Sequence, residues 1–90
     1  MGGEPLCSEN LEPVENIVAG VRTAFPHIKI FLWTGYTLEE LKKQKNKYIE
    51  SILSHIDVLI DGPFIQEKKD LTLELRGSSN QRILYKNIDF

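Results

Sequence analysis

A short stretch at the start of the chain carries the residues best suited to bind a ligand. Gly2-Gly3-Glu4-Pro5 places two glycines, an acid and a proline directly before an amphipathic segment. Glycine carbonyls can approach a ligand closely because no Cβ stands in the way, and a carboxylate accepts hydrogen bonds from a cation. These residues could therefore line a ligand site that offers an anionic acceptor. On composition alone, a flexible start of the chain is the alternative.

Two further groups of residues could do chemistry later in the chain. Asp57 and Asp61 bracket an apolar run and fall on the same face of a strand, which allows a metal or phosphate-acceptor interpretation. Helix capping or pairing with Lys and Arg is the commoner use of such acids. The segment 76–82 could form an anion-binding nest of backbone amides between Arg76 and Arg82, or a plain polar turn.

Composition excludes several classes of protein. The single cysteine, Cys7, cannot form an internal disulfide and cannot alone hold zinc or an iron–sulfur cluster. Eleven Lys and Arg against thirteen acids give no basic excess of the kind that nucleic-acid-binding proteins show. The longest apolar run, 30–33, is far too short for a membrane span, and residues 1–15 lack the basic start of a secretory signal. We therefore expect a cytoplasmic protein with no nucleic-acid and no membrane partner.

The elements that position these residues alternate between helix and strand. Apolar residues recur three and four positions apart from Ser8 to Phe25, which predicts an amphipathic helix that Pro26 ends. The β-branched and aromatic run 28–33 predicts a strand, with its tryptophan in the core. Thr37-Leu38-Glu39-Glu40 is a capping box that starts a short helix.

Another helix and another strand follow, and the last third of the chain is less regular. Apolar spacing from Tyr48 to Ile56 predicts a helix, and 57–61 a buried strand. The alternation 71–75 and the run 82–85 predict one or two more strands. Strands that alternate with helices imply right-handed crossovers, so we expect one domain over 1–90, of the α/β class with a parallel sheet. Ligands of such sheets bind beyond the carboxyl ends of the strands, where Thr34 lies.

Four motifs in one order resemble a known family. They are Gly-Gly-Glu-Pro-Leu at 2–6, Trp-Thr-Gly-Tyr-Thr-Leu-Glu-Glu-Leu at 33–41, Asp-Val-Leu-Ile-Asp-Gly-Pro-Phe at 57–64 and Arg-Gly-Ser-Ser-Asn-Gln-Arg at 76–82. The chain resembles, over nearly its whole length, the activating proteins of anaerobic ribonucleotide reductase. These are radical S-adenosylmethionine activases of glycyl-radical enzymes.

This resemblance implies a fold, a reaction and a site. The fold is a partial TIM-like barrel in which a [4Fe–4S] cluster on three cysteines reduces S-adenosylmethionine, and the radical formed takes a hydrogen atom from a glycine of the reductase. In the family, the loop that matches Gly2, Gly3, Glu4 and Pro5 receives the methionine ammonium. Thr34 matches a position that contacts the methionine carboxylate or the ribose. Residues 76–82 are assigned to adenosine or partner contact.

The sequence departs from the family in one respect. The family's Cys-x-x-x-Cys-x-x-Cys motif precedes the Gly-Gly-Glu-Pro loop, and here only Met1 does. We therefore expect the C-terminal part of an activase without its cluster-binding strands, inactive alone, with the reductase as partner. The strand 28–33 would lack a neighbour, so we also expect a homodimer through that exposed edge. The alternative is a non-catalytic α/β binding module for a small anionic ligand or a protein partner.

Overall fold

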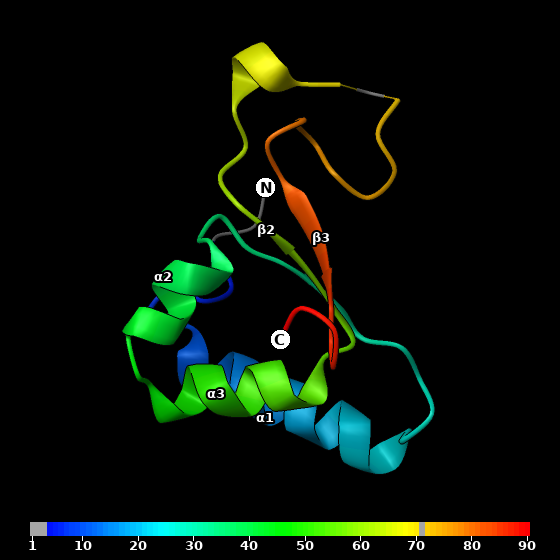
Figure 1. Cartoon of the computed structure of the whole chain (residues 1–90). Helices are drawn as coiled ribbons and strands as arrows, with labels where there is room; N and C mark the ends of the chain where they lie inside the picture. Colours follow the sequence, from blue (N-terminus) through cyan, green and yellow to red (C-terminus); the bar gives the residue numbers. More distant parts are fainter. Residues whose placement is uncertain (1–3, 71) are drawn as a thin grey trace.

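A computed structural model describes residues 4–70 and 72–90 of the chain, and its elements alternate much as the sequence predicts (Figure 1). Gly2 and Gly3 of the predicted site lie outside the described residues. The elements are α1 (Leu11–Ala24), β1 (Phe31–Trp33), α2 (Leu38–Lys43), α3 (Lys47–His55), β2 (Val58–Asp61), the 3-10 helix η1 (Gln66–Lys68) and β3 (Arg82–Tyr85). None of the described helices is long and apolar enough to cross a membrane.

The sheet of the described residues has the order β1-β2-β3. β1 and β2 are parallel, with Phe31 beside Val58, whereas β2 and β3 are antiparallel, with Asp61 beside Arg82. The α/β class is confirmed, but the prediction of a parallel sheet is wrong for its last strand. The described residues of 62–70 and 72–81 form no crossover α-helix, so the chain turns back at the carboxyl end of β2 and returns antiparallel.

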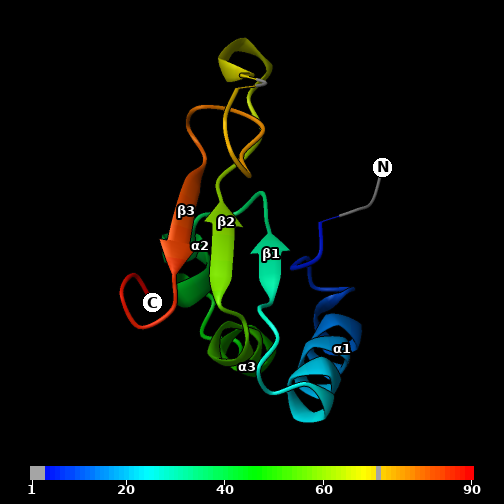
Figure 2. The same cartoon turned by 90° about the vertical axis from the view of Figure 1, so that its right-hand side faces the viewer.

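The helices α2 and α3 lie behind the sheet when it is viewed from its open face (Figure 2). The core fills the space between helices and sheet, and its fully buried members are Leu6, Leu41, Ile49, Ile52, Ile56 and Leu59. Leu32 packs against this core, whereas Phe31 and Trp33 point to the opposite face, where Trp33 is 47% exposed. The prediction of a core tryptophan is therefore wrong, because the pleat of β1 gives the helices only its middle residue.

Local signals set the ends of the helices. The predicted capping box is present: Glu40 N donates to Thr37 Oγ1 at 3.1 Å, and Thr37 N donates to Glu40 Oε1 at 2.8 Å. α1 begins at Leu11 and not at Ser8, since the chain from 5 to 10 forms turns. The predicted strand over 71–75 is wrong for the described residues 72–75, which form turns and bends in which Leu75 has a φ of 66°.

Candidate functional site

The Glu4 carboxylate lies at the carboxyl end of β1. Its Oε2 accepts hydrogen bonds from Thr34 Oγ1 at 2.7 Å and from Leu6 N at 2.9 Å. Its Oε1 accepts one from Gly35 N at 2.5 Å. The structure thus brings together Glu4 and Thr34, two residues selected from the sequence that lie thirty positions apart.

The loop after β1 has a fixed shape around this carboxylate. Thr34 is buried and its N–H donates to Ile60 O at 3.0 Å, which continues the pairing with β2. Its hydroxyl also accepts a hydrogen bond from Tyr36 N at 3.2 Å. A Cβ on Gly35 would lie 3.1 Å from Glu4 Oε1, so this glycine permits the close approach of the carboxylate to the backbone.

The donors that hold Glu4 are all neutral. Three ion pairs are formed by the described residues, and all of them involve Arg22 or Arg82 and acids other than Glu4. The negative charge of Glu4 is therefore held in place by two backbone amides and a hydroxyl, and no cation of residues 4–70 and 72–90 forms an ion pair with it. A carboxylate has about four acceptor positions, so one remains for a ligand.

An open pocket of about 290 Å³ lies against this carboxylate. Pro5 lines it together with Glu4 and Thr34, so it gathers the described members of the predicted site. The remaining lining residues are Trp33, Gly35, Phe64 and Gln81. We call this space the Glu4 pocket. Gln81 lies in the segment 76–82 that was assigned to adenosine or partner contact. Trp33 and Phe64 were not predicted as site residues from the sequence, and only the position of Trp33 next to Thr34 could have indicated one of them.

Asp61 has a structural role next to this site. It is fully buried, its Oδ2 accepts a hydrogen bond from Leu38 N at 2.8 Å, and Arg82 pairs with it. Hydrogen bonds to Asp61 and then to Glu39 raise the pKa of Arg82 above its ordinary value. The same guanidinium lowers the pKa of Glu39. Asp61 thus anchors the start of α2 and the start of β3 to the end of β2.

Asp57 has a similar role at the amino end of β1. Its Oδ2 accepts hydrogen bonds from Arg22 Nη2 at 2.6 Å and from Ile30 N at 2.8 Å. Burial alone would raise the pKa of Asp57, but the bonds from Ile30 and Arg22 outweigh it and hold that pKa below its ordinary value. Both aspartates therefore pair with arginines, and the described residues contain no group of three or more His, Cys, Asp or Glu able to hold a metal ion.

The segment 76–82 is not an anion-binding nest. The amides of Gly77 and Ser78 donate to Gln81 Oε1 at 2.8 and 3.2 Å. Gln81 Nε2 donates to Gly62 O at 2.9 Å. The nest prediction is wrong because a side chain of the same segment takes the amides that an anion would need.

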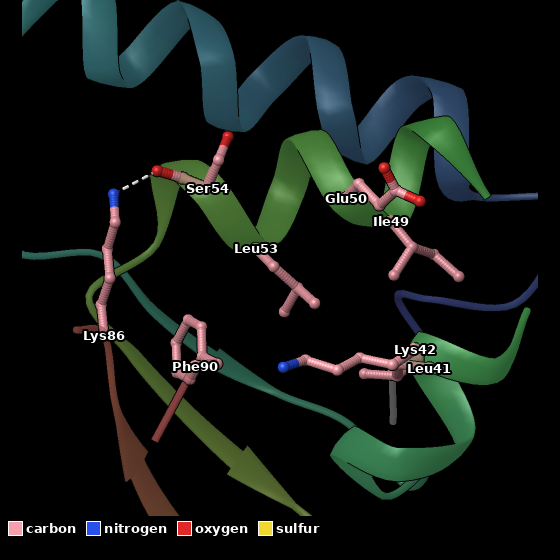
Figure 3. Close-up of a pocket in the computed structure, with 8 residues that line it drawn as sticks. All are labelled: Leu41, Lys42, Ile49, Glu50, Leu53, Ser54, Lys86 and Phe90. Atoms are coloured by element: carbon pink, nitrogen blue, oxygen red, sulfur yellow. Dashed lines mark hydrogen bonds between the residues drawn. The ribbon is translucent and has the colours of Figure 1, made fainter. Parts of the chain in front are cut away.

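A second pocket, of about 340 Å³, lies on the helical side of the sheet (Figure 3). It is formed by α2, α3 and the last described residues, with Leu41, Ile49, Leu53 and Phe90 as its apolar lining. Figure 3 shows the side chains of Lys42 and Leu53 pointing into the space beside Phe90. This pocket shares no lining residue with the Glu4 pocket and contains none of the predicted site residues.

Comparison with known proteins places this arrangement in a family. A domain family described as "4Fe-4S single cluster domain" matches residues 1–84. The chain belongs to this family. Relatives named anaerobic ribonucleoside-triphosphate reductase-activating protein include one from Vibrio cholerae, 49% identical over 82 residues, which are 91% of this chain and 50% of that protein. The namesake from Enterobacteria phage T4 is 43% identical over 89 residues, 98% of this chain and 51% of that protein.

The chain matches only part of the length of its relatives. It spans about half the length of the curated relatives it matches, and the recognition of reductase-activating proteins from the sequence motifs is confirmed. No significant match to a solved structure is found. The family description implies an iron–sulfur cluster, which needs several cysteine ligands. The ninety residues contain only the half-buried Cys7, so they do not fit such a cluster.

Proposed function

We propose that these residues form the S-adenosylmethionine-binding part of a radical activase that acts on anaerobic ribonucleotide reductase. The names of the relatives support the reductase as partner, and the four sequence motifs support the radical type of activase. The observation that carries the proposal is the Glu4 carboxylate, held by Thr34 and Gly35 at the carboxyl end of β1 with no ion-pair partner in the part of the chain that the structure describes.

The geometry indicates how the cosubstrate would bind. The methionine ammonium is a cation with three donors, and it fits the one acceptor position that remains on Glu4. The Thr34 hydroxyl already donates its proton to Glu4 and has one acceptor position left after the bond from Tyr36. It would therefore accept a hydrogen bond from the ribose or the ammonium, and has no proton left to donate to the methionine carboxylate.

The proposed reaction needs more than this chain. When bound and reduced by one electron, S-adenosylmethionine supplies the hydrogen-abstracting group that converts a glycine of the reductase into a glycyl radical. The residues described above bind and orient the cosubstrate. None of them fits the cluster that would deliver the electron, so the oxidoreductase activity belongs to the complete activase and the ninety residues are inactive alone.

The proposal extends to the fold and the assembly. It includes a fragment of a partial TIM-like barrel, a cytoplasmic location, and neither nucleic acid nor membrane as partner. β1 is an edge strand among the described residues, which supports a homodimer through that edge. Sedimentation at increasing protein concentration would show the dimer, and a monomer at every concentration would rule it out.

Titration with S-adenosylmethionine tests the site. We expect it to shift the NMR signals of the Thr34 and Gly35 amides, and Glu4→Gln to abolish these shifts. The matched control is Glu9→Gln, which removes the same charge from an exposed position before α1 and should leave binding unchanged. Equal binding by Glu4→Gln would contradict the proposal. An anionic ligand that bound better to Glu4→Gln would favour the alternative binding module.

A further inference from the structure

One segment of the chain contacts both aromatic side chains of the Glu4 pocket. We call residues Leu75–Gln81 the clamp. The indole Nε1 of Trp33 donates to Leu75 O at 2.7 Å, which fixes the tryptophan ring on the open face of the sheet. The ring of Phe64 lies against Gly77, which also belongs to the clamp. The clamp therefore holds both aromatic walls of the pocket.

Gln81 fixes the turn that carries Phe64. Its side chain is largely buried and joins Gly62 O to the amides of Gly77 and Ser78. The neighbouring Asn80 Nδ2 donates to Pro63 O at 2.8 Å. The two carbonyls that precede Phe64 are thus both held by side chains of the clamp.

Gly77 sets the position of the Phe64 ring. A Cβ at position 77 would lie 2.9 Å from Phe64 Cδ1 and 3.1 Å from Cε1, so the ring would have to move. Leu75 adds a second sign of close fitting, because its φ of 66° is strained for a bulky residue and persists only where contacts hold it. The carbonyl that Leu75 presents to Trp33 is one such contact.

We propose that Gly77 and Gln81 are positioning residues that hold Trp33 and Phe64 as walls for the adenine ring of S-adenosylmethionine. This inference rests on the proposed function. The two rings are 47% and 51% exposed, so their surfaces remain free to contact a flat ligand, and they share the pocket with the Glu4 carboxylate. A ligand with an aromatic base and an ammonium matches this combination of aromatic surface and negative charge.

The test separates the two halves of the ligand. Trp33 is the only tryptophan in the sequence, so its fluorescence reports binding of S-adenosylmethionine, adenosine and L-methionine in separate titrations. We expect Gly77→Ala to weaken S-adenosylmethionine and adenosine about tenfold, as loss of one base–aromatic contact does, and to leave L-methionine within about twofold. Gly20→Ala is the matched control, because a Cβ there meets nothing within 4 Å.

Two further variants keep the inference testable if Gly77→Ala does not fold. Phe64→Leu changes a half-exposed ring and should cause the same selective loss of adenosine binding. Gln81→Met removes the acceptor for the two amides and the donor to Gly62 without adding a charge to the pocket, so its effect should be of the same kind.

Each outcome has a clear reading. Equal weakening of adenosine and L-methionine by Gly77→Ala or Phe64→Leu would mean general distortion, and would overturn the inference. Unchanged adenosine binding would also overturn it. Suppose that the wild-type chain binds S-adenosylmethionine, that Glu4→Gln abolishes this binding, and that the clamp variants leave it unchanged. The proposed function then stands and the inference fails. If Glu4→Gln has no effect, the proposed function fails.

Discussion

The two ends of β1 each hold an acid, and the two acids are compensated differently. At the amino end, Asp57 faces the Arg22 guanidinium and the amide of Ile30. At the carboxyl end, Glu4 faces a hydroxyl and two amides, with no cation in contact among the described residues. The two carboxylates thus have similar hydrogen bonding and different charge balance.

This difference separates a structural acid from a binding acid. The Asp57 pair closes on itself, because Arg22 also donates to His55 O at 2.7 Å and to Ile28 O at 3.0 Å and so joins α1 to the ends of its neighbours. Glu4 forms no ion pair with the described residues and lies beside an open pocket. An acid that served only the fold would gain from an arginine, so the lack of an ion pair between Glu4 and any described residue supports a ligand that brings a cation.

Replacing an arginine that pairs with an acid should lower the free energy of unfolding most where the acid is most buried. Arg82→Met leaves the fully buried Asp61 without its cation, and we expect a loss of about 3 kcal/mol in the free energy of unfolding. This is the low end for a broken buried pair, because Arg82 itself is 44% exposed. Urea unfolding measures the change. A loss below about 1 kcal/mol would show that solvent already screens Asp61.

The matching substitution at the amino end of β1 should lower the free energy of unfolding by less. Arg22→Met leaves Asp57, whose side chain is 31% exposed, partly hydrated. We expect a loss of about 2 kcal/mol, because hydrogen bonds to carbonyls are lost together with the ion pair. If Arg22→Met lowers the free energy of unfolding more than Arg82→Met does in the same urea experiment, burial of the acid does not decide which loss is larger.

Glu4→Gln should separate stability from binding. The amide keeps one acceptor oxygen and places its NH₂ group against a donor, so we expect a loss of about 1 kcal/mol in the free energy of unfolding. Binding of S-adenosylmethionine should be lost at the same time. A gain in stability, measured by thermal unfolding, would indicate that the charge itself is unfavourable in the free protein.

The smallest effect should appear as pH dependence at the amino end. The pKa of Asp57 is lower in the folded chain than its ordinary 3.8, so its contribution to stability is full above that value and is lost as the pH falls through the folded pKa. Asp57→Asn should therefore flatten the decline of stability between about pH 5 and pH 2. Glu39 and Asp70, whose pKa values are also lowered, should account for the decline that remains.

Local patterns in the sequence predicted much of the fold. The capping box at Thr37 and the position of the last strand were predicted because each depends on neighbouring residues. The direction of β3 was not, since alternation locates a strand without giving its sense. The alternation of Phe31 and Trp33 likewise shows that they share a face, but only the placement of the helices decides which face is open.

The candidate site was predicted in part. Glu4 and Thr34 were selected because their residue types suit the ligand, and the structure brings them together. Gln81 was included only as part of the segment 76–82, and its own role was missed because it depends on a contact with Gly62, nineteen positions away. The anion nest failed for the same reason: a turn of Gly, Ser and Asn offers amides, but the sequence does not show which side chain takes them.

The position of Glu4 also decides how the protein can be tethered. β3 runs from Arg82 beside Asp61 to Tyr85 beside Val58, so the chain leaves the sheet at the end opposite the Glu4 pocket. An affinity tag or fluorophore on the amino-terminal side would be joined to the described chain through Glu4, a residue that lines that pocket. Surface immobilisation for binding measurements is therefore better made through the carboxyl-terminal side, where the attachment leaves ligand entry unobstructed.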